Sequence, residues 1–107
     1  MHKSDAEYII LKKFEDNPYL TQRELSKELG VSLGKTNYII NALIDKGWLK
    51  LNNFKRSDKK LGYIYLLTPM GISEKTILAQ KFLRRKSEEY NRLKEEIEKL
   101  KNELWRN

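Results

Sequence analysis

Two helices joined by a very short, glycine-centred turn are predicted between residues 20 and 50 of this chain. Thr21 and Glu24 have the spacing of a capping box, which begins the first helix. Gly30 supplies the left-handed conformation that ends this helix, and Ser32 can cap the next one. So short a turn forces the two helices to cross steeply.

The second of these helices is expected over residues 33–46, with Gly47 placed to end it. Five apolar residues would hold the two helices together: Leu25, Leu29, Val31, Ile40 and Leu43. Helices that cross in this way are typical of a helix-turn-helix, whose second helix lies in the major groove of DNA. The pattern therefore favours a DNA-binding protein.

A helix is also predicted before this pair, from Ser4 to about Asn17. Ser4 and Glu7 have the spacing of another capping box, and Asn17 with Pro18 would end the helix. Its apolar face is formed by Tyr8, Ile10, Leu11 and Phe14. This helix would supply part of the core beneath the helix-turn-helix.

Two strands are predicted after the helix-turn-helix, over residues 48–54 and 62–67, because both segments are rich in aromatic and β-branched residues. The polar segment between them would be the tip of a hairpin, the wing of a winged helix. Thr68 and Pro69 then begin a helix that nothing interrupts after Gly71. At about 55 Å this helix would project beyond a small domain.

The expected fold class is therefore mainly α with a small β-hairpin (α+β). Residues 1–68 would form a winged helix-turn-helix DNA-binding domain, and residues 69–107 a long C-terminal helix with a coiled-coil dimerisation segment. A chain of 107 residues with 35% charged content has room for one small core and such an appendage.

The formal net charge of +7 is concentrated in the second half of this domain. Residues 31–68 contain seven Lys or Arg against two Asp or Glu, whereas residues 1–30 contain five against six. A positive region of this kind favours a polyanionic partner, although lysine-rich surfaces also serve solubility alone.

Several classes of function lack the residues they need. The chain has no cysteine and a single histidine, His2, so neither a disulfide nor a metal site is expected, and no cofactor. Its acidic residues are scattered over helical faces and no phosphate-binding glycine loop is present, so an enzyme is not expected. Without an apolar run of about twenty residues or a signal sequence, we expect cytoplasmic residence and no membrane contact.

The residues expected to touch DNA follow from helical periodicity, because Thr36, Ile40 and Leu43 should face the core. The start and outer face of the second helix are formed by Ser32, Leu33, Gly34, Lys35, Asn37, Tyr38 and Asn41. Asn37 and Asn41 suit bidentate contacts with adenine.

The other side chains of that face have different expected roles. Lys35 suits guanine or phosphate, Leu33 suits a thymine methyl group, and Gly34 permits a close backbone approach. For Tyr38 two roles remain open: it reaches a base edge, or its ring packs on the domain and only its hydroxyl meets a phosphate. Ser32, Thr21 and Gln22, at the starts of the two helices, are expected near phosphate oxygens, although capping alone explains Ser32 and Thr21 equally well.

Two basic clusters complete the candidate surface. The wing cluster, expected on the phosphate backbone or in the minor groove, consists of Lys55, Arg56, Lys59 and Lys60. A second cluster on the long helix, expected to be solvated although a DNA contact stays open, consists of Lys81, Arg84, Arg85 and Lys86.

The long helix carries a narrow apolar stripe with steps of three and four residues, formed by Leu83, Tyr90, Leu93, Ile97, Leu100 and Leu104. This spacing matches the a and d positions of a heptad and predicts a homodimer through the C-terminal helix. A parallel pair would set Glu89 and Glu96 against Lys94 and Lys101 of the other copy. Further dimer contacts are expected from Ile72, Ile77, Leu78, Phe82 and the first helix. The alternative is that the helix folds back onto the core.

These residues resemble MarR-type winged-helix regulators, and within them the short group associated with exopolysaccharide gene clusters. The resemblance is carried by residues 17–25, 30–38, 46–47, 53–55 and 65–72. It implies a dimeric, sequence-specific transcription factor whose helix from Ser32 reads the major groove while the wing lies on the backbone. By analogy of fold, it favours repression.

The chain departs from that family in two respects. Typical members have Asp-x-Arg in the wing, whereas this chain has Asp58-Lys59-Lys60, and lysine lacks the planar fork of arginine. Typical members also use helices at both ends to form a dimer and a ligand pocket, and here one short and one long helix remain. A small-molecule effector is therefore not expected.

The favoured interpretation is a sequence-specific double-stranded DNA-binding transcriptional regulator, a homodimeric repressor that reads a palindromic operator. The alternative is a winged-helix protein–protein interaction module whose coiled-coil stalk binds a partner.

Overall fold

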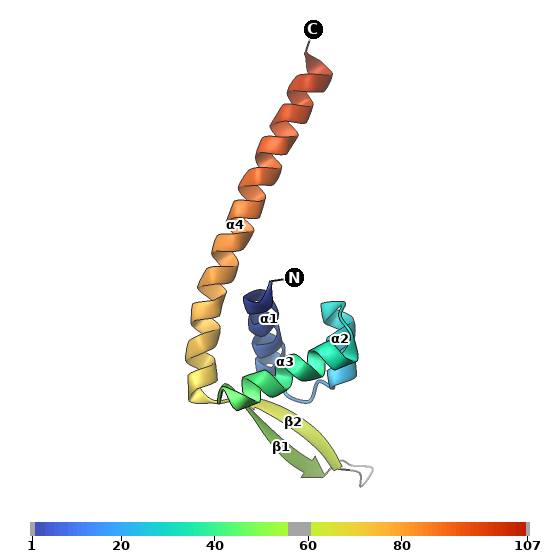
Figure 1. Ribbon diagram of the computed structural model, residues 1–107, viewed down its shortest axis with the longest axis vertical. Coiled ribbons are helices and arrows are strands. Elements are labelled where there is room, and N and C mark those ends of the chain that lie inside the picture. The colour runs from blue at the N-terminus through green and yellow to red at the C-terminus, as the bar shows by residue number, and fades with distance from the viewer. Residues whose placement is uncertain (1, 56–60, 107) are drawn as a thin grey trace.

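The structure, a computed structural model, describes residues 2–55 and 61–106 of the chain. Its elements are α1 (Lys3–Asp16), α2 (Gln22–Leu29), α3 (Leu33–Asp45), β1 (Leu49–Lys55), β2 (Leu61–Leu67) and α4 (Pro69–Trp105). Figure 1 shows the first three helices and the hairpin gathered at one end, with α4 extending away from them. The predicted mainly α fold with a small β-hairpin is confirmed.

The core lies around one face of α1. Ile10, Leu11 and Phe14 on this face are at most 1% exposed. Buried residues from the other elements pack against them: Leu20, Leu25, Leu29, Ile40, Leu43, Leu49, Tyr65 and Leu78. These include the apolar residues expected to hold the crossing of α2 and α3, while Val31 packs at the edge of the core. One small core thus holds α1, the helix-turn-helix, the base of the hairpin and the start of α4.

The hairpin is a two-stranded antiparallel sheet that runs from the pair Leu49–Leu67 at its base to the pair Lys55–Leu61. The side chains of Leu49 and Tyr65 are buried against the helices, whereas Leu51 and Tyr63 are exposed. The base of the hairpin is therefore anchored in the core, and the strands extend outward from it (Figure 1).

Most predicted helix ends are confirmed. Thr21 and Glu24 form the capping box of α2, and Gly30 ends that helix in the left-handed conformation at φ 69°. Ser32 caps α3, and Thr68 caps α4 with Pro69 in its first turn. These signals act within four residues, so the sequence alone contains the whole interaction.

The capping box predicted for α1 is wrong. His2 is the cap, because its Nδ1 accepts a hydrogen bond from the backbone N–H of Ser4 over 3.2 Å. Glu7 instead faces the core, where its Oε2 lies 2.6 Å from Nζ of Lys46 at the end of α3. An ionic partner supplied by the tertiary fold has replaced the local backbone contact.

The first part of α4 packs along α1. The rings of Tyr8 and Phe82 lie 5.1 Å apart, and Leu78 is 5% exposed. Lys75 pairs with Glu15 farther along the same helix pair. The expectation that Leu78 contributes to a dimer is therefore wrong, because α1 of the same chain covers it, whereas Phe82, Ile72 and Ile77 remain partly exposed.

Within the basic cluster on α4, Arg85 is bound to α1, whereas Lys81, Arg84 and Lys86 are exposed. Arg85 donates from Nε to Asp5 Oδ1 over 3.1 Å and from Nη2 to Ser4 Oγ over 2.5 Å. This contact joins α4 to the start of α1. Among the described residues, it is the hydrogen-bonded contact with the domain that lies farthest along α4.

Beyond Arg85, α4 projects. The molecule measures 71 × 29 × 21 Å, and Figure 1 shows that its long dimension follows this helix. The alternative in which the helix folds back onto the core is therefore wrong. Among the helices of the described residues, none is both long and apolar enough to cross a membrane.

The start of α4 fits tightly against the end of α3. The backbone N–H of Thr68 donates to the carbonyl oxygen of Trp48 over 3.1 Å, and the Thr68 hydroxyl donates to the carbonyl oxygen of Gly47. Gly71 faces the same peptide group, and a Cβ atom there would overlap the Trp48 carbonyl oxygen and lie 2.9 Å from its carbon. Only glycine allows this approach of α4 to β1.

Gly71→Ala should therefore lower the free energy of unfolding by about 1–3 kcal/mol, because backbone must move to admit the methyl group. Urea unfolding followed by circular dichroism measures the change. Gly34→Ala is the matched control, since its Cβ would meet no atom within 4 Å. In that exposed helical position alanine should raise the free energy of unfolding by about 0.5–1 kcal/mol. Wild-type stability in Gly71→Ala would contradict the close approach.

Candidate nucleic-acid interface

Three residues separate α2 from α3. Local hydrogen bonds to the last turn of α2 and the first turn of α3 hold their backbone. The N–H groups of Gly30 and Val31 both donate to the carbonyl oxygen of Ser26, over 2.9 and 3.2 Å. The Ser32 hydroxyl then accepts a hydrogen bond from the N–H of Lys35 over 3.0 Å. The direction in which α3 leaves the turn is thereby fixed.

The inner face of α3 is completely buried. Thr36, Ile40 and Leu43 are each 0% exposed, as expected from their spacing. The Thr36 hydroxyl donates to the carbonyl oxygen of Ser32 over 3.0 Å, so this polar group is satisfied inside the core. The rotation of α3 about its own axis is therefore set by packing.

This rotation exposes the residues predicted to face DNA: Ser32, Leu33, Gly34, Lys35, Asn37, Tyr38 and Asn41. Tyr38 is 73% exposed, which excludes the alternative in which its ring packs on the domain. The set combines one lysine, two amides, a phenol and a serine hydroxyl with one apolar side chain and one glycine. Base edges and phosphates can be bound by groups of these kinds.

A chain of hydrogen bonds connects this face to the rest of the domain. Nδ2 of Asn41 donates to Oδ1 of Asn37 over 3.1 Å, and Nδ2 of Asn37 donates to Oε1 of Gln22 over 3.0 Å. Nε2 of Gln22 in turn donates to the hydroxyl of Tyr65 over 2.8 Å. Side chains from α3, α2 and β2 thus form one polar network.

Tyr65 was not among the predicted site residues. Its ring is 6% exposed and lies 4.7 Å from that of Phe14, and its N–H donates to the carbonyl oxygen of Pro18. The alternation of the strand indicates only an inward-facing aromatic residue. No local signal links its hydroxyl to Gln22, which is 43 residues away.

The start of α2 is occupied by its own cap. The Thr21 hydroxyl donates to Glu24 Oε1 over 2.8 Å and accepts from the N–H of Glu24 over 3.1 Å. Gln22 uses both ends of its amide in the network just described. The two residues predicted near phosphate therefore already have partners within the chain.

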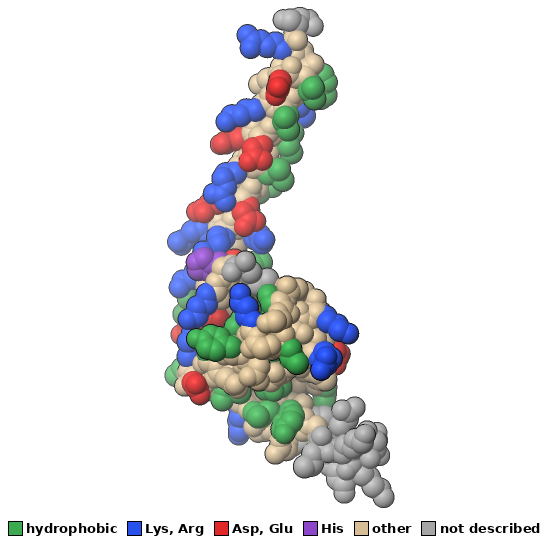
Figure 2. All heavy atoms as spheres, turned by 45° about the vertical axis from the view of Figure 1, so that its right-hand side comes forward, with side chains coloured by type: hydrophobic (Ala, Val, Ile, Leu, Met, Phe, Trp, Pro, Cys, Tyr) green, Lys and Arg blue, Asp and Glu red, His purple; other side chains and the backbone are tan. Residues whose placement is uncertain are grey.

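The cations near α3 are not equivalent. Lys46 is exposed, but its Nζ is paired with Glu7 and lies 4.5 Å from the centre of the Trp48 ring, so its charge is largely neutralised within the chain. Lys35 and Lys50 are exposed. The wing cluster cannot be placed, because Arg56, Lys59 and Lys60 and the side chain of Lys55 lie outside the described residues. Figure 2 shows Lys and Arg side chains both on the domain and along α4.

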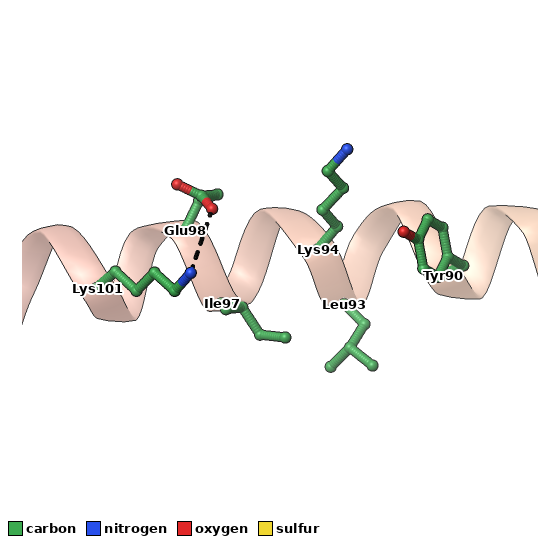
Figure 3. Close-up of a pocket in the computed structure, with 6 residues that line it drawn as sticks. All are labelled: Tyr90, Leu93, Lys94, Ile97, Glu98 and Lys101. Carbon is green, nitrogen blue, oxygen red and sulfur yellow. Dashed lines mark ion pairs between the residues drawn. The ribbon is translucent and has the colours of Figure 1, made fainter.

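The predicted stripe of α4 is exposed along its length. Tyr90, Ile97 and Leu104 are between 42% and 75% exposed, and Leu83, Leu93 and Leu100 are within the same limits. Figure 2 shows hydrophobic side chains along one side of the projecting helix, with charged groups on the other. In Figure 3, Leu93 and Ile97 point to the same side, away from the Glu98–Lys101 ion pair. The six residues drawn in Figure 3 line a pocket, and all of them belong to α4.

Within residues 2–55 and 61–106, no three His, Cys, Asp or Glu side chains come together as a metal site.

The Ser32 cap can be tested by stability. Ser32→Ala should lower the free energy of unfolding by about 1 kcal/mol, because the N–H of Lys35 loses its acceptor. Ser32→Asp, which keeps an acceptor at the same place, should unfold at nearly the wild-type urea concentration. The cap would contribute nothing if both variants unfolded like the wild type.

Comparisons with known proteins agree with this geometry. The family described as winged helix-turn-helix DNA-binding matches residues 5–50. No curated protein sequence matches the chain. Among solved structures, a MarR/EmrR family transcriptional regulator from Acinetobacter sp. ADP1 is 19% identical, with 94% of this chain and 75% of that chain covered and a TM-score of 0.60.

Two structures of MarR from E. coli are also similar. The wild-type apo form is 24% identical, with coverage of 89% of this chain and 76% of that chain and a TM-score of 0.58. A mutant in complex with operator DNA is 23% identical, with coverage of 89% and 73% and a TM-score of 0.57. The chain is thus a winged helix-turn-helix protein with the fold of the MarR-family transcriptional regulators.

Proposed function

We propose that this chain is a sequence-specific, double-stranded DNA-binding transcriptional regulator and acts as a homodimeric repressor on a palindromic operator. The observation that carries the proposal is the outer face of α3, where exposed amides and a lysine stand on a helix whose inner face is buried and whose start is fixed by a three-residue turn. The matched winged helix-turn-helix family and the operator-bound relative support it.

In this proposal residues 1–68 bind DNA. The outer face of α3 enters the major groove, where Asn37 and Asn41 suit adenine and Leu33 suits a thymine methyl group. Lys35 reaches guanine or phosphate, Gly34 permits a close approach, and the Tyr38 hydroxyl reaches a phosphate. Thr21, Gln22 and Ser32, at the starts of α2 and α3, lie near phosphate oxygens. The wing residues Lys55, Arg56, Lys59 and Lys60 contact the backbone or minor groove.

Residues 69–107 provide the dimer contact. A stripe of large apolar side chains that is exposed over the whole projecting half of α4 is expected to be covered by a second helix. In a parallel homodimer, Glu89 and Glu96 meet Lys94 and Lys101 of the other copy. The two recognition helices then read the two halves of a symmetric site.

The proposal is tested by measuring binding to DNA upstream of the chain's own gene and to scrambled DNA across a salt series. We expect operator-selective binding, at least about a thousandfold over scrambled DNA, and a steep fall of affinity with salt. Lys35→Ala should reduce the slope of log affinity against log salt by about one unit. Lys99→Ala, an equal loss of charge on the projecting helix, should leave the slope unchanged.

Two results would contradict the proposal in different ways. Weak binding to both DNAs with equal affinity would remove the sequence-specific regulator and leave a general DNA-binding protein. No binding even at low salt would favour the interaction module instead.

The dimer is tested with the paired substitution Ile97→Ser and Leu100→Ser. These residues are 42% and 55% exposed in the single chain, so their loss should not unfold the domain but should remove the apolar seam. Sedimentation equilibrium should give the mass of a monomer. Glu95→Ser with Lys99→Ser, two changes on the polar side of the same turns, should remain dimeric. An unchanged mass in the Ile97 and Leu100 variant would exclude the stripe as the dimer contact.

A further inference from the structure

The hydrogen-bonded network on the outer face of α3 joins three side-chain amides in series to one buried hydroxyl. Each amide donates to the next residue, from Asn41 to Asn37, from Asn37 to Gln22, and from Gln22 to the Tyr65 hydroxyl. Reversing any one amide would set donor against donor or acceptor against acceptor. The orientation of every amide in the network is therefore coupled to that of its neighbours.

The fixed end of this network is the Tyr65 hydroxyl. The Tyr65 side chain is 6% exposed and its ring packs on Phe14, which is 1% exposed. Its backbone is also tied to the loop before α2, through the carbonyl oxygen of Pro18 over 3.2 Å. The hydroxyl therefore occupies a place set by the core, and Gln22 is held by it at the first position of α2.

The free end of the network is Asn41. One of its two Nδ2 hydrogens is donated to Asn37. Its Oδ1 accepts no hydrogen bond from the described part of the chain. The residue is exposed. One Nδ2 hydrogen and both Oδ1 lone pairs remain free, and they supply the donor and the acceptor that an adenine edge requires. Asn37, in contrast, is engaged at both ends of its amide and keeps only one hydrogen and one lone pair.

We propose that Tyr65 and Gln22 are positioning residues that act through Asn37 to hold the Asn41 amide in the orientation that reads adenine. Asn41 makes the base contact, and Asn37 supports it. The inference rests on the proposed DNA-binding function and narrows it to one reading residue. Holding the amide before binding removes part of the ordering cost that a free side chain would incur on the DNA.

The experiment begins with an operator selected by the wild-type protein from random double-stranded DNA. Affinities are then measured for this operator and for versions in which each A·T pair is replaced by G·C. The position that Asn41 reads is the one whose replacement weakens the wild type but not Asn41→Ala. Tyr65→Phe, which keeps the ring and removes only the hydroxyl, should lower the preference at this position by about threefold to tenfold.

Tyr63→Phe is the matched control. It removes the same group from the same strand, but Tyr63 is 60% exposed and its hydroxyl makes no hydrogen bond with the described residues. Its preference at the reading position should equal that of the wild type. Gln22→Ala breaks the network at a partly exposed residue and should lower the preference as Tyr65→Phe does. Urea unfolding of each variant separates lost preference from lost structure.

A double-mutant cycle tests whether Tyr65 acts through Asn41. The cycle measures affinity for the selected operator. In an Asn41→Ala background, Tyr65→Phe should cause no further loss of this affinity, because the residue that it positions is absent. An equal loss of operator affinity in both backgrounds, or an unchanged preference in Tyr65→Phe, would overturn the inference while leaving DNA binding intact. A wild-type protein that selects no sequence would instead overturn the proposed function.

Discussion

Ile10, Leu11 and Phe14 bury one face of α1, and α2, α3, β2 and α4 all contact this helix. The helix-turn-helix has too little apolar surface of its own to hold two short helices, because α2 has only eight residues. Its stability depends on the surface that α1 offers beneath it. The orientation of α3, the anchoring of the hairpin and the direction of α4 all follow from packing on that surface.

Local signals in the sequence predicted most of the fold. The capping box at Thr21, the left-handed Gly30 and the cap at Ser32 each act within a few residues, so their outcome depends little on the rest of the chain. The capping box expected at Ser4 and Glu7 failed for the opposite reason. Lys46 approaches Glu7 only after α3 has packed on α1, and this ion pair offers the carboxylate a stronger partner than a backbone N–H.

The candidate site was predicted in the same uneven way. Helical periodicity is sufficient to separate Thr36 and Ile40 from the exposed residues of α3, because one face is completely buried. It does not identify Tyr65. The contribution of this residue depends on where β2, which is distant in the sequence from α2, places the tyrosine hydroxyl. The charge balance of residues 31–68 likewise overstates the positive charge available to a partner, since Lys46 is paired with Glu7 of α1.

The long helix begins at Pro69 and continues without interruption to Trp105. Its cap, Thr68, is hydrogen-bonded to Gly47 and Trp48 in the connection between α3 and β1. The apolar stripe is therefore joined to the domain by an uninterrupted helix. The direction in which the stripe faces, relative to the outer face of α3, depends on the number of residues in α4 before it. One residue added between Arg85 and Tyr90 would turn the stripe by about 100° about the helix axis. The number of residues in this helix thus sets the rotation of the stripe relative to α3 as well as its distance from it. Keeping the apolar residues of the stripe would not by itself preserve this rotation.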